Sequence, residues 1–177
     1  VWPDVLTPPK GYGPINLVAA RVANGLYKKG YDVTSFVAKG SKVNGKIVGI
    51  EKPELSDIVI NDPSLFHFVT IAEFLKRKDD FDIIHSHIGY ASIVLLDIIN
   101  KPIVITLHGN YNNTYTPLVY RKYAQKAHFV AISEAQKKTL PGVDFVGTVY
   151  HGVDVKEYLF KDSTEDYMAY VGRTSPE

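Results

Sequence analysis

The feature that most constrains the fold is a regular alternation of short apolar runs with segments of helical periodicity. The apolar runs are uninterrupted and rich in Val and Ile, which is typical of strands buried on both faces of a parallel sheet. The segments between them carry apolar residues three and four positions apart, which indicates helices. The predicted strands are 31–39, 46–50, 82–86, 102–108, 128–133 and 145–150. The predicted helices are 15–29, 64–77, 90–100, 117–126 and a short one from 134.

This alternation predicts an α/β fold: a doubly wound, mostly parallel, Rossmann-like sheet with helices on both faces and right-handed crossovers. We expect this domain to occupy residues 1–160, with Val1 as the stub of a first strand. Residues 161–166, KDSTED, have the composition of a polar linker, and residues 167–177 begin another strand. We therefore expect 161–177 to be the linker and first strand of a C-terminal domain that is otherwise outside this chain.

The composition excludes several classes of function. The chain has 20 Lys and Arg against 19 Asp and Glu, and its densest basic run is only Lys76 to Lys78, so nothing indicates a nucleic-acid partner. It has no cysteine, which excludes disulfides, thiolate catalysis and cysteine-bound zinc and fits a cytoplasmic location. The longest apolar stretch, 88–99, contains Asp97 and is shorter than the roughly 20 residues that cross a bilayer. We expect no transmembrane segment, which leaves room only for a peripheral membrane contact.

Ligands of open α/β sheets bind at the carboxyl ends of the strands, so polar residues there are candidates for a site. Four such places are the loop Gly11–Gly13, His85 with His87, His108, and His151 with Gly152. The two glycines allow a tight turn and a close backbone approach ahead of a helix N-terminus, which favours an anion. Pro14 fits the first helical position. A plain strand-to-helix turn is the alternative for this loop.

The histidines differ in what their positions predict. His85 lies within a strand pattern, as a core histidine does, whereas His87 lies at the rim. His108 follows an apolar strand and precedes a polar loop that contains Asn110, so it is placed to donate a hydrogen bond to a sugar hydroxyl, a carbonyl or a phosphate. We predict a catalytic role for His108 and substrate-binding roles for His87 and Asn110. The histidines lack carboxylate partners at ligand spacing, so no metal site is expected.

A short helix start is also visible in the sequence. Ser133 and Gln136 have the spacing of a capping box, in which both side chains satisfy backbone N–H groups. Glu134, between them, is expected to face solvent. Helix capping therefore accounts for these residues, and we predict no catalytic role for them.

Several motifs occur in a fixed order along nearly the whole chain. They are PPKGYGPIN, KKGYDVTSFVAKGS, FDIIHSH, VITLHG, AISEAQKKTL, YHGVDVKEY and YVGRTSPE. In the same order they resemble seven segments of one family. These are the glycine loop PP-x-GYGG-x-E, the segments GHEVTLFAPGDS, DVVHAH, T-x-HG, AVSEA and N/H-GVD, and the first strand of the C-terminal domain. That family is the group 1 retaining glycosyltransferases of GT-B fold, and the chain resembles their N-terminal domain.

The resemblance implies two facing Rossmann-like domains with the reaction in the cleft between them. It implies a hexosyltransferase that moves a sugar from a nucleotide-sugar donor to a sugar or lipid-linked acceptor with retention. By resemblance, Gly11 and Gly13 belong to the loop beside the donor phosphates and the acceptor. His108 matches a residue that contacts the transferred sugar, and Arg173 matches one that meets the diphosphate. The family generally needs no metal, and no cofactor is implied because the nucleotide-sugar is a substrate.

The resemblance also implies that the C-terminal domain grips most of the donor, so we expect the chain alone to fold but not to transfer sugar. Two positions depart from the family pattern. Pro14 stands in place of a glycine and lacks an N–H for a phosphate, and Asn16 stands in place of a glutamate.

Other functions stay open at this stage. A non-catalytic sugar- or nucleotide-binding module would lack the pair of glutamates expected in the C-terminal domain. A GT-B sugar-nucleotide epimerase is less consistent with the GYG loop and the T-x-HG segment. A dehydrogenase is disfavoured because the dinucleotide fingerprint is broken at Asn16.

Overall fold

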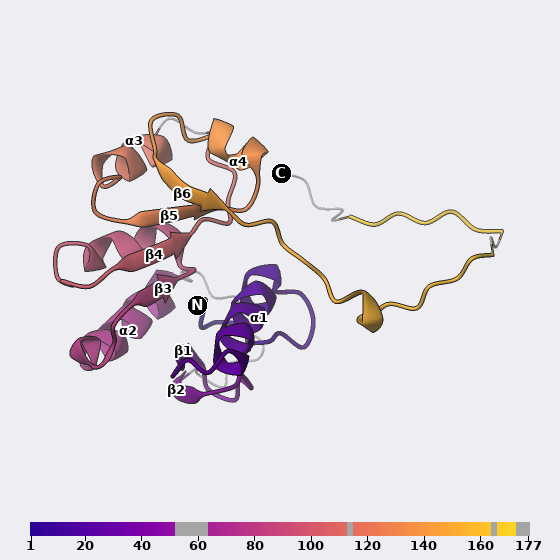
Figure 1. Cartoon of the computed structure of the whole chain (residues 1–177), viewed down its shortest axis with the longest axis horizontal. Helices are drawn as coiled ribbons and strands as arrows, with labels where there is room; N and C mark the ends of the chain where they lie inside the picture. Colours follow the sequence, from indigo (N-terminus) through magenta and orange to yellow (C-terminus); the bar gives the residue numbers. More distant parts are fainter. Residues whose placement is uncertain (52–63, 113–114, 164–165, 173–177) are drawn as a thin grey trace.

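The computed structural model of the chain describes residues 1–51, 64–112, 115–163 and 166–172, and it has the expected α/β architecture (Figure 1). Its described strands form two sheets. In the first, β1 (Thr34–Ala38) pairs with β2 (Lys46–Ile50). The second has the order β3 (Ile84–Ser86), β4 (Ile103–Thr106), β5 (His128–Ala131) and β6 (Phe145–Thr148). Every pairing is parallel, which confirms the Rossmann-like prediction.

Helices flank these sheets. The α-helices are α1 (Pro14–Lys28), α2 (Ser64–Leu75), α3 (Tyr115–Lys122) and α4 (Glu134–Lys138), and the 3-10 helices are η1 (Lys78–Asp80), η2 (Gly89–Leu95) and η3 (Val155–Glu157). Helix α1 begins at a proline, whose missing N–H costs nothing at that position. It ends before Gly30, which has a φ of 90° that favours glycine.

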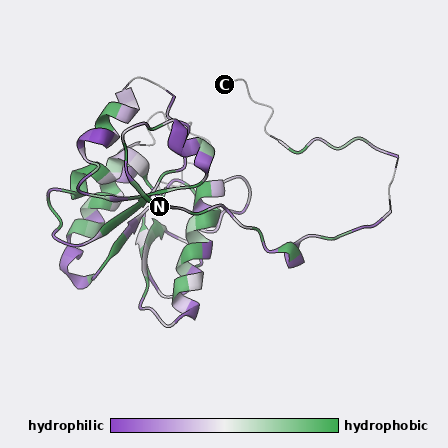
Figure 2. Cartoon of the chain, turned by 45° about the horizontal axis from the view of Figure 1, so that its top comes forward, coloured by the Kyte–Doolittle hydropathy of each residue, from purple (hydrophilic) through white to green (hydrophobic). Residues whose placement is uncertain are grey.

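The core lies between the four-stranded sheet and its helices. Ile105, Leu107 and Phe129 have no exposed surface, and Tyr120 from α3 packs edge-on against Phe129 with ring centroids 5.4 Å apart. Full burial of an apolar side chain of this size stabilises the fold by about 1.5–3 kcal/mol. Figure 2 shows the hydrophobic colour concentrated on the central strands. The apolar runs of the sequence therefore form the interior, as predicted.

The segment predicted as a helix at 90–100 is helical over only part of that range. It forms the 3-10 helix η2, in which Ala91 N–H donates to Ile88 O and Leu96 N–H donates to Ile93 O, three residues back. The β-branched Ile93 and Val94 have a low preference for the α-helix. The Ser92 and Ser86 hydroxyls are hydrogen-bonded at 2.6 Å, which ties this turn to the end of β3.

Two segments predicted as strands also form no strand within the described residues. The residues from Val1 to Pro3 form no strand, although the amino group of Val1 donates to the carbonyl of Phe36 in β1 at 3.5 Å. The described part of the predicted strand 167–177, residues 167–172, forms no strand, is fully exposed and lies apart from the sheets (Figure 1). A strand needs a neighbour to satisfy its backbone groups, and none lies beside this segment in Figure 1. The predicted domain boundary at 160 stays a prediction.

Candidate functional site

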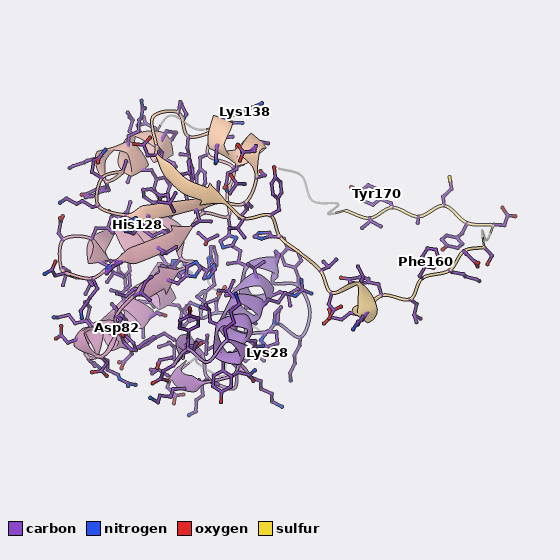
Figure 3. The ribbon with its side chains drawn as sticks, in the orientation of Figure 1. Lys28, Asp82, His128, Lys138, Phe160 and Tyr170 are labelled. Atoms are coloured by element: carbon purple, nitrogen blue, oxygen red, sulfur yellow. The ribbon has the colours of Figure 1, made fainter. Side chains whose placement is uncertain are left out.

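The carboxyl ends of β3 to β6 form one edge of the four-stranded sheet, called the carboxyl edge below. Figure 3 labels Asp82, just before β3, and His128, at the start of β5. Both lie on the far side of the sheet from the exposed segment that carries Phe160. The carboxyl edge therefore faces α1 and that exposed segment. Loops leaving this edge carry His87, His108 and Asn110, which are three of the predicted site residues.

Four histidines form a column along the carboxyl edge. The ring centroids of His85 and His87 are 4.4 Å apart, those of His87 and His108 are 5.2 Å apart, and those of His108 and His151 are 5.4 Å apart. Successive rings are tilted by only 26–30°. His85 and His87 come from β3 and its end, His108 follows β4, and His151 follows β6. We call these four residues the histidine stack.

Within the histidine stack, one direct hydrogen bond joins two of the predicted residues. His87 Nδ1 lies 2.9 Å from His108 Nε2, and His87 is only 4% exposed. One nitrogen must donate and the other accept, so the tautomer of one ring determines that of the other. His85 is fixed separately, because its Nε2 lies 2.8 Å from Thr106 Oγ1 in β4. The structure therefore brings His87 and His108 together, although the sequence placed them 21 residues apart.

The electrostatics of the histidine stack favour neutral rings. Burial, followed by the charges of the neighbouring histidines, lowers the pKa of His87 well below its usual value. Burial, followed by the charges of His151 and His85, lowers the pKa of His108 to about 4. Partial burial also lowers the pKa of His151. At neutral pH these imidazoles therefore donate and accept hydrogen bonds as neutral groups, which suits contact with sugar hydroxyls.

Gln136 holds the backbone on both sides of His108, a role that the sequence analysis missed. Its amide nitrogen donates to Leu107 O at 2.9 Å and to Gly109 O at 2.8 Å. Its amide oxygen accepts from Ile132 N–H at 2.9 Å, and the side chain is buried. The turn that presents His108 is thus fixed from α4 of the neighbouring βα unit. The capping-box spacing gave a signal for this residue, but not for its partners.

The capping prediction itself is confirmed in part. Ser133 Oγ accepts from the backbone N–H of Gln136 at 3.1 Å, as an N-cap does. The Gln136 side chain serves the His108 turn instead of returning to the N-cap. Glu134 is exposed, as predicted, and a hydrogen bond from the Thr148 hydroxyl lowers its pKa.

The glycine loop is closely packed around Gly13 and open around Gly11. A Cβ on Gly13 would lie 2.9 Å from Pro9 Cβ and 3.1 Å from Val5 Cγ1, so packing requires glycine there. A Cβ on Gly11 would have nothing within 4 Å. Gly11 is therefore not needed for internal packing, which leaves its open side for a ligand that approaches the backbone.

Asn16 organises this loop, and this role was also missed. The side chain is 2% exposed, and its amide nitrogen lies 2.8 Å from Trp2 O, 2.9 Å from Val5 O and 3.0 Å from Thr7 Oγ1. An amide that gathers three acceptors fixes residues 2–7 against the first turn of α1. A carboxylate at this position could not donate to the carbonyls of Trp2 and Val5, which gives a structural reason for the departure from the glutamate of the family pattern.

Helix α1 links the glycine loop to the carboxyl edge. Arg21 Nη1 donates to Gly152 O, directly after His151, and Arg21 Nη2 lies 3.2 Å from Glu157 Oε2. Gly13 is eight residues before Arg21, so a helical rise of about 1.5 Å per residue places it about 12 Å along the helix axis. Helix α1 thus connects the glycine loop at its start with the backbone beside His151, which Arg21 contacts.

Two other predicted residues are not part of this arrangement. Asn110 Oδ1 accepts from the N–H of Asn112 at 3.2 Å, so its side chain caps its own loop. Arg173 lies outside the described residues. Within the described ranges, no three His, Asp or Glu side chains are grouped so as to hold a metal ion. None of the helices in that part of the chain is long and apolar enough to cross a membrane.

Comparison with known families gives one match. The sequence profile of the family described as Glycosyltransferase Family 4 matches residues 15–157, which is most of the chain and includes α1, β1 to β6 and the histidine stack. No curated protein matches the chain.

Proposed function

Because the chain belongs to glycosyltransferase family 4, we propose that it forms the acceptor-side half of a retaining enzyme that takes a sugar from a nucleotide-sugar donor. The family match and the parallel α/β fold support the coarse statement that this is a glycosyltransferase domain of GT-B type. The finer statement extends it to a hexose as the transferred sugar and to a sugar or lipid-linked acceptor. We further propose that the enzyme needs no cofactor and works in the cytoplasm.

The observation that carries this proposal is the His87–His108 pair at the carboxyl edge. His108 is half-buried, hydrogen-bonded to His87 and held on both flanks by Gln136, so its ring position is well defined. A pKa of about 4 leaves it neutral at neutral pH. Such a ring is suited to hydrogen-bond a hydroxyl of the transferred sugar, which is the role proposed for it.

The remaining site residues complete the proposal. Gly11 offers an open backbone position beside the start of α1, where the donor phosphates or the acceptor would approach. His87 would position His108, and Asn110 would line the acceptor side of the same loop. Arg173 is proposed to meet the diphosphate from the other wall of the cleft. Because that wall belongs to a second domain, this chain alone is expected to fold without transferring sugar.

The direct test is His108→Ala in the full-length protein, with His128→Ala as the matched control. His128 is exposed at the start of β5, on the opposite edge of the sheet. Loss of one well-placed hydrogen-bond donor at a developing charge costs about 10²-fold or more in turnover. We expect that loss in His108→Ala and unchanged turnover in His128→Ala. Unchanged kcat/KM in His108→Ala would remove it from the catalytic site.

The reaction class is tested with a panel of UDP-, GDP- and ADP-sugars and a set of sugar and lipid-linked acceptors. Proton NMR of the product reads the anomeric configuration, and retention is the expected result. Release of an epimerised sugar nucleotide without acceptor would replace the transferase with an epimerase. Binding without any turnover would leave a sugar- or nucleotide-binding module. Turnover by residues 1–177 alone, at the rate of the full-length protein, would contradict a split site.

A further inference from the structure

We propose that His151 is a positioning residue for His108. The two rings stack with their centroids 5.4 Å apart and their planes 26° from parallel. The His87 ring instead meets the Nε2 edge of His108 through the 2.9 Å hydrogen bond, with the ring centroids 5.2 Å apart. His108 therefore lies between two imidazoles, and His151 closes the end of the histidine stack that is nearest to the exposed segment.

The second ring matters because one hydrogen bond does not fix an imidazole plane. The His87–His108 bond sets the position of Nε2, but the ring can still swing about that contact. Stacking of the His151 ring on His108 restricts this motion, since offset stacked rings have a preferred separation and tilt. His151 therefore supplies a restraint that neither His87 nor the backbone contacts of Gln136 provide.

His151 is itself held in place, although its side chain is exposed. The strand β6 ends three residues before it. The carbonyl of the next residue, Gly152, accepts a hydrogen bond from Arg21 in α1, and Arg21 also pairs with Glu157. The backbone on both sides of His151 is therefore tied to secondary structure, so its ring is presented to His108 from a fixed point.

The consequence for chemistry concerns the second nitrogen of His108. His108 Nε2 is engaged by His87, whereas His108 Nδ1 is buried without a hydrogen-bond partner. A buried polar atom without a partner in an otherwise bonded site is a candidate for contact with a ligand. The stack determines which direction this nitrogen faces. The assignment of this ligand as a sugar hydroxyl rests on the proposed function. The stacking of His151 on His108 does not depend on that function.

The experiment follows the ring resonances of His108 in the chain itself by carbon–proton NMR. His151→Ala removes the ring, His151→Phe keeps a stacking ring without a titrating group, and His128→Ala is the control. The charges of His151 and His85 lower the pKa of His108, and the buried His87 is hydrogen-bonded to it. Thermal denaturation of each variant is recorded, so that a general loss of stability is separated from an effect on His108.

In His151→Ala we expect the His108 ring signals to lose their stacking shift and its titration midpoint to rise by about one pH unit, because burial and a neighbouring charge are both removed. In His151→Phe we expect the stacking shift to return. His108 signals in His151→Ala that match those of His128→Ala would overturn the proposal. If His151→Ala does not fold, His151→Phe decides: an altered His108 shift there would overturn it, and a retained shift would support it. No substrate is needed, so failure of the proposed transferase activity would not affect this result.

Discussion

Replacing Gln136 is expected to destabilise the turn that carries His108. The side chain donates to two backbone carbonyls, Leu107 O and Gly109 O, and accepts from one N–H, that of Ile132. Gln136→Ala removes all three hydrogen bonds and leaves these groups facing a small cavity. Each bond contributes about 1 kcal/mol, so the free energy of unfolding should fall by about 3 kcal/mol.

For a domain of this size, about 3 kcal/mol corresponds to a fall of roughly 6–12 °C in Tm. The measurement is urea denaturation and thermal unfolding followed by circular dichroism. Gln125→Ala is the matched control, because Gln125 is exposed in the turn after α3. Surface substitutions of this kind change stability by about 0.5 kcal/mol or less.

Gln136→Glu separates the hydrogen bonds from the cavity, because it keeps the shape of the side chain. The introduced carboxylate would face two carbonyl oxygens, so its pKa in the folded state should be raised above the unfolded value. Stability relative to wild type is then lost as the pH rises through that folded-state pKa and recovered as the pH falls. We expect the stability difference between this variant and wild type to be larger at pH 7 than at pH 5.

The reasoning about Gln136 would be refuted by two results. One is a Gln136→Ala variant as stable as Gln125→Ala. The other is a Gln136→Glu variant whose difference from wild type does not change with pH. Either result would mean that the Gln136 hydrogen bonds do not hold the His108 turn.

Three further predictions concern stability. The histidine stack titrates below the unfolded pKa of 6.5, with His108 at about 4, so the unfolded state binds more protons between these values. For His108 the free energy of unfolding should therefore fall by up to about 1.4 kcal/mol per pH unit as the pH drops from about 6.5 to about 4, and the lowered pKa values of the other rings act in the same direction. His87→Phe should flatten this slope in urea denaturation, and an unchanged slope would contradict it. Asn16→Ala should lower Tm by several degrees and expose residues 2–13 to proteolysis, whereas Asn100→Ala at an exposed position should do neither. Gly13→Ala should destabilise the domain because a Cβ there would lie 2.9 Å from a proline carbon, and Gly11→Ala should leave Tm unchanged.

The sequence was sufficient for the fold class and most elements because each depends on local periodicity. The runs that form β4 and β5 are apolar apart from Thr106 and His128, and the structure pairs them in parallel at the centre of the sheet. The helix α1 was bounded correctly within one residue at each end, by Pro14 and Gly30. Periodicity does not separate an α-helix from a 3-10 helix, so the sequence predicted a helix at 90–100 without its kind, and η2 covers only Gly89–Leu95.

The site was predicted less completely, because its contacts are made between elements. His87 and His108 were selected as residues that follow strands, and parallel strands place such residues at one edge. The distance of 2.9 Å between their nitrogens depends on the register of β3 with β4, which no local pattern specifies. The partners of Gln136 and Asn16 are mostly backbone carbonyls of other segments, so the sequence carried no signal for these contacts, although the capping-box spacing singled out Gln136.

The charge of the site has a consequence for where catalysis is completed. Departure of a nucleoside diphosphate develops negative charge, which must be offset by cations or oriented dipoles. The described histidines cannot supply this cation, because the pKa of His108 is about 4 and that of His87 lies well below its usual value. If these rings were protonated, the His87–His108 hydrogen bond would also be lost, because one of its two nitrogens must accept. Under the proposed function, the positive charge would come from outside the histidine stack, either from the start of α1 beside the glycine loop or from Arg173, which is proposed to meet the diphosphate. The neutral histidines would then orient the sugar and would not offset the charge of the leaving group.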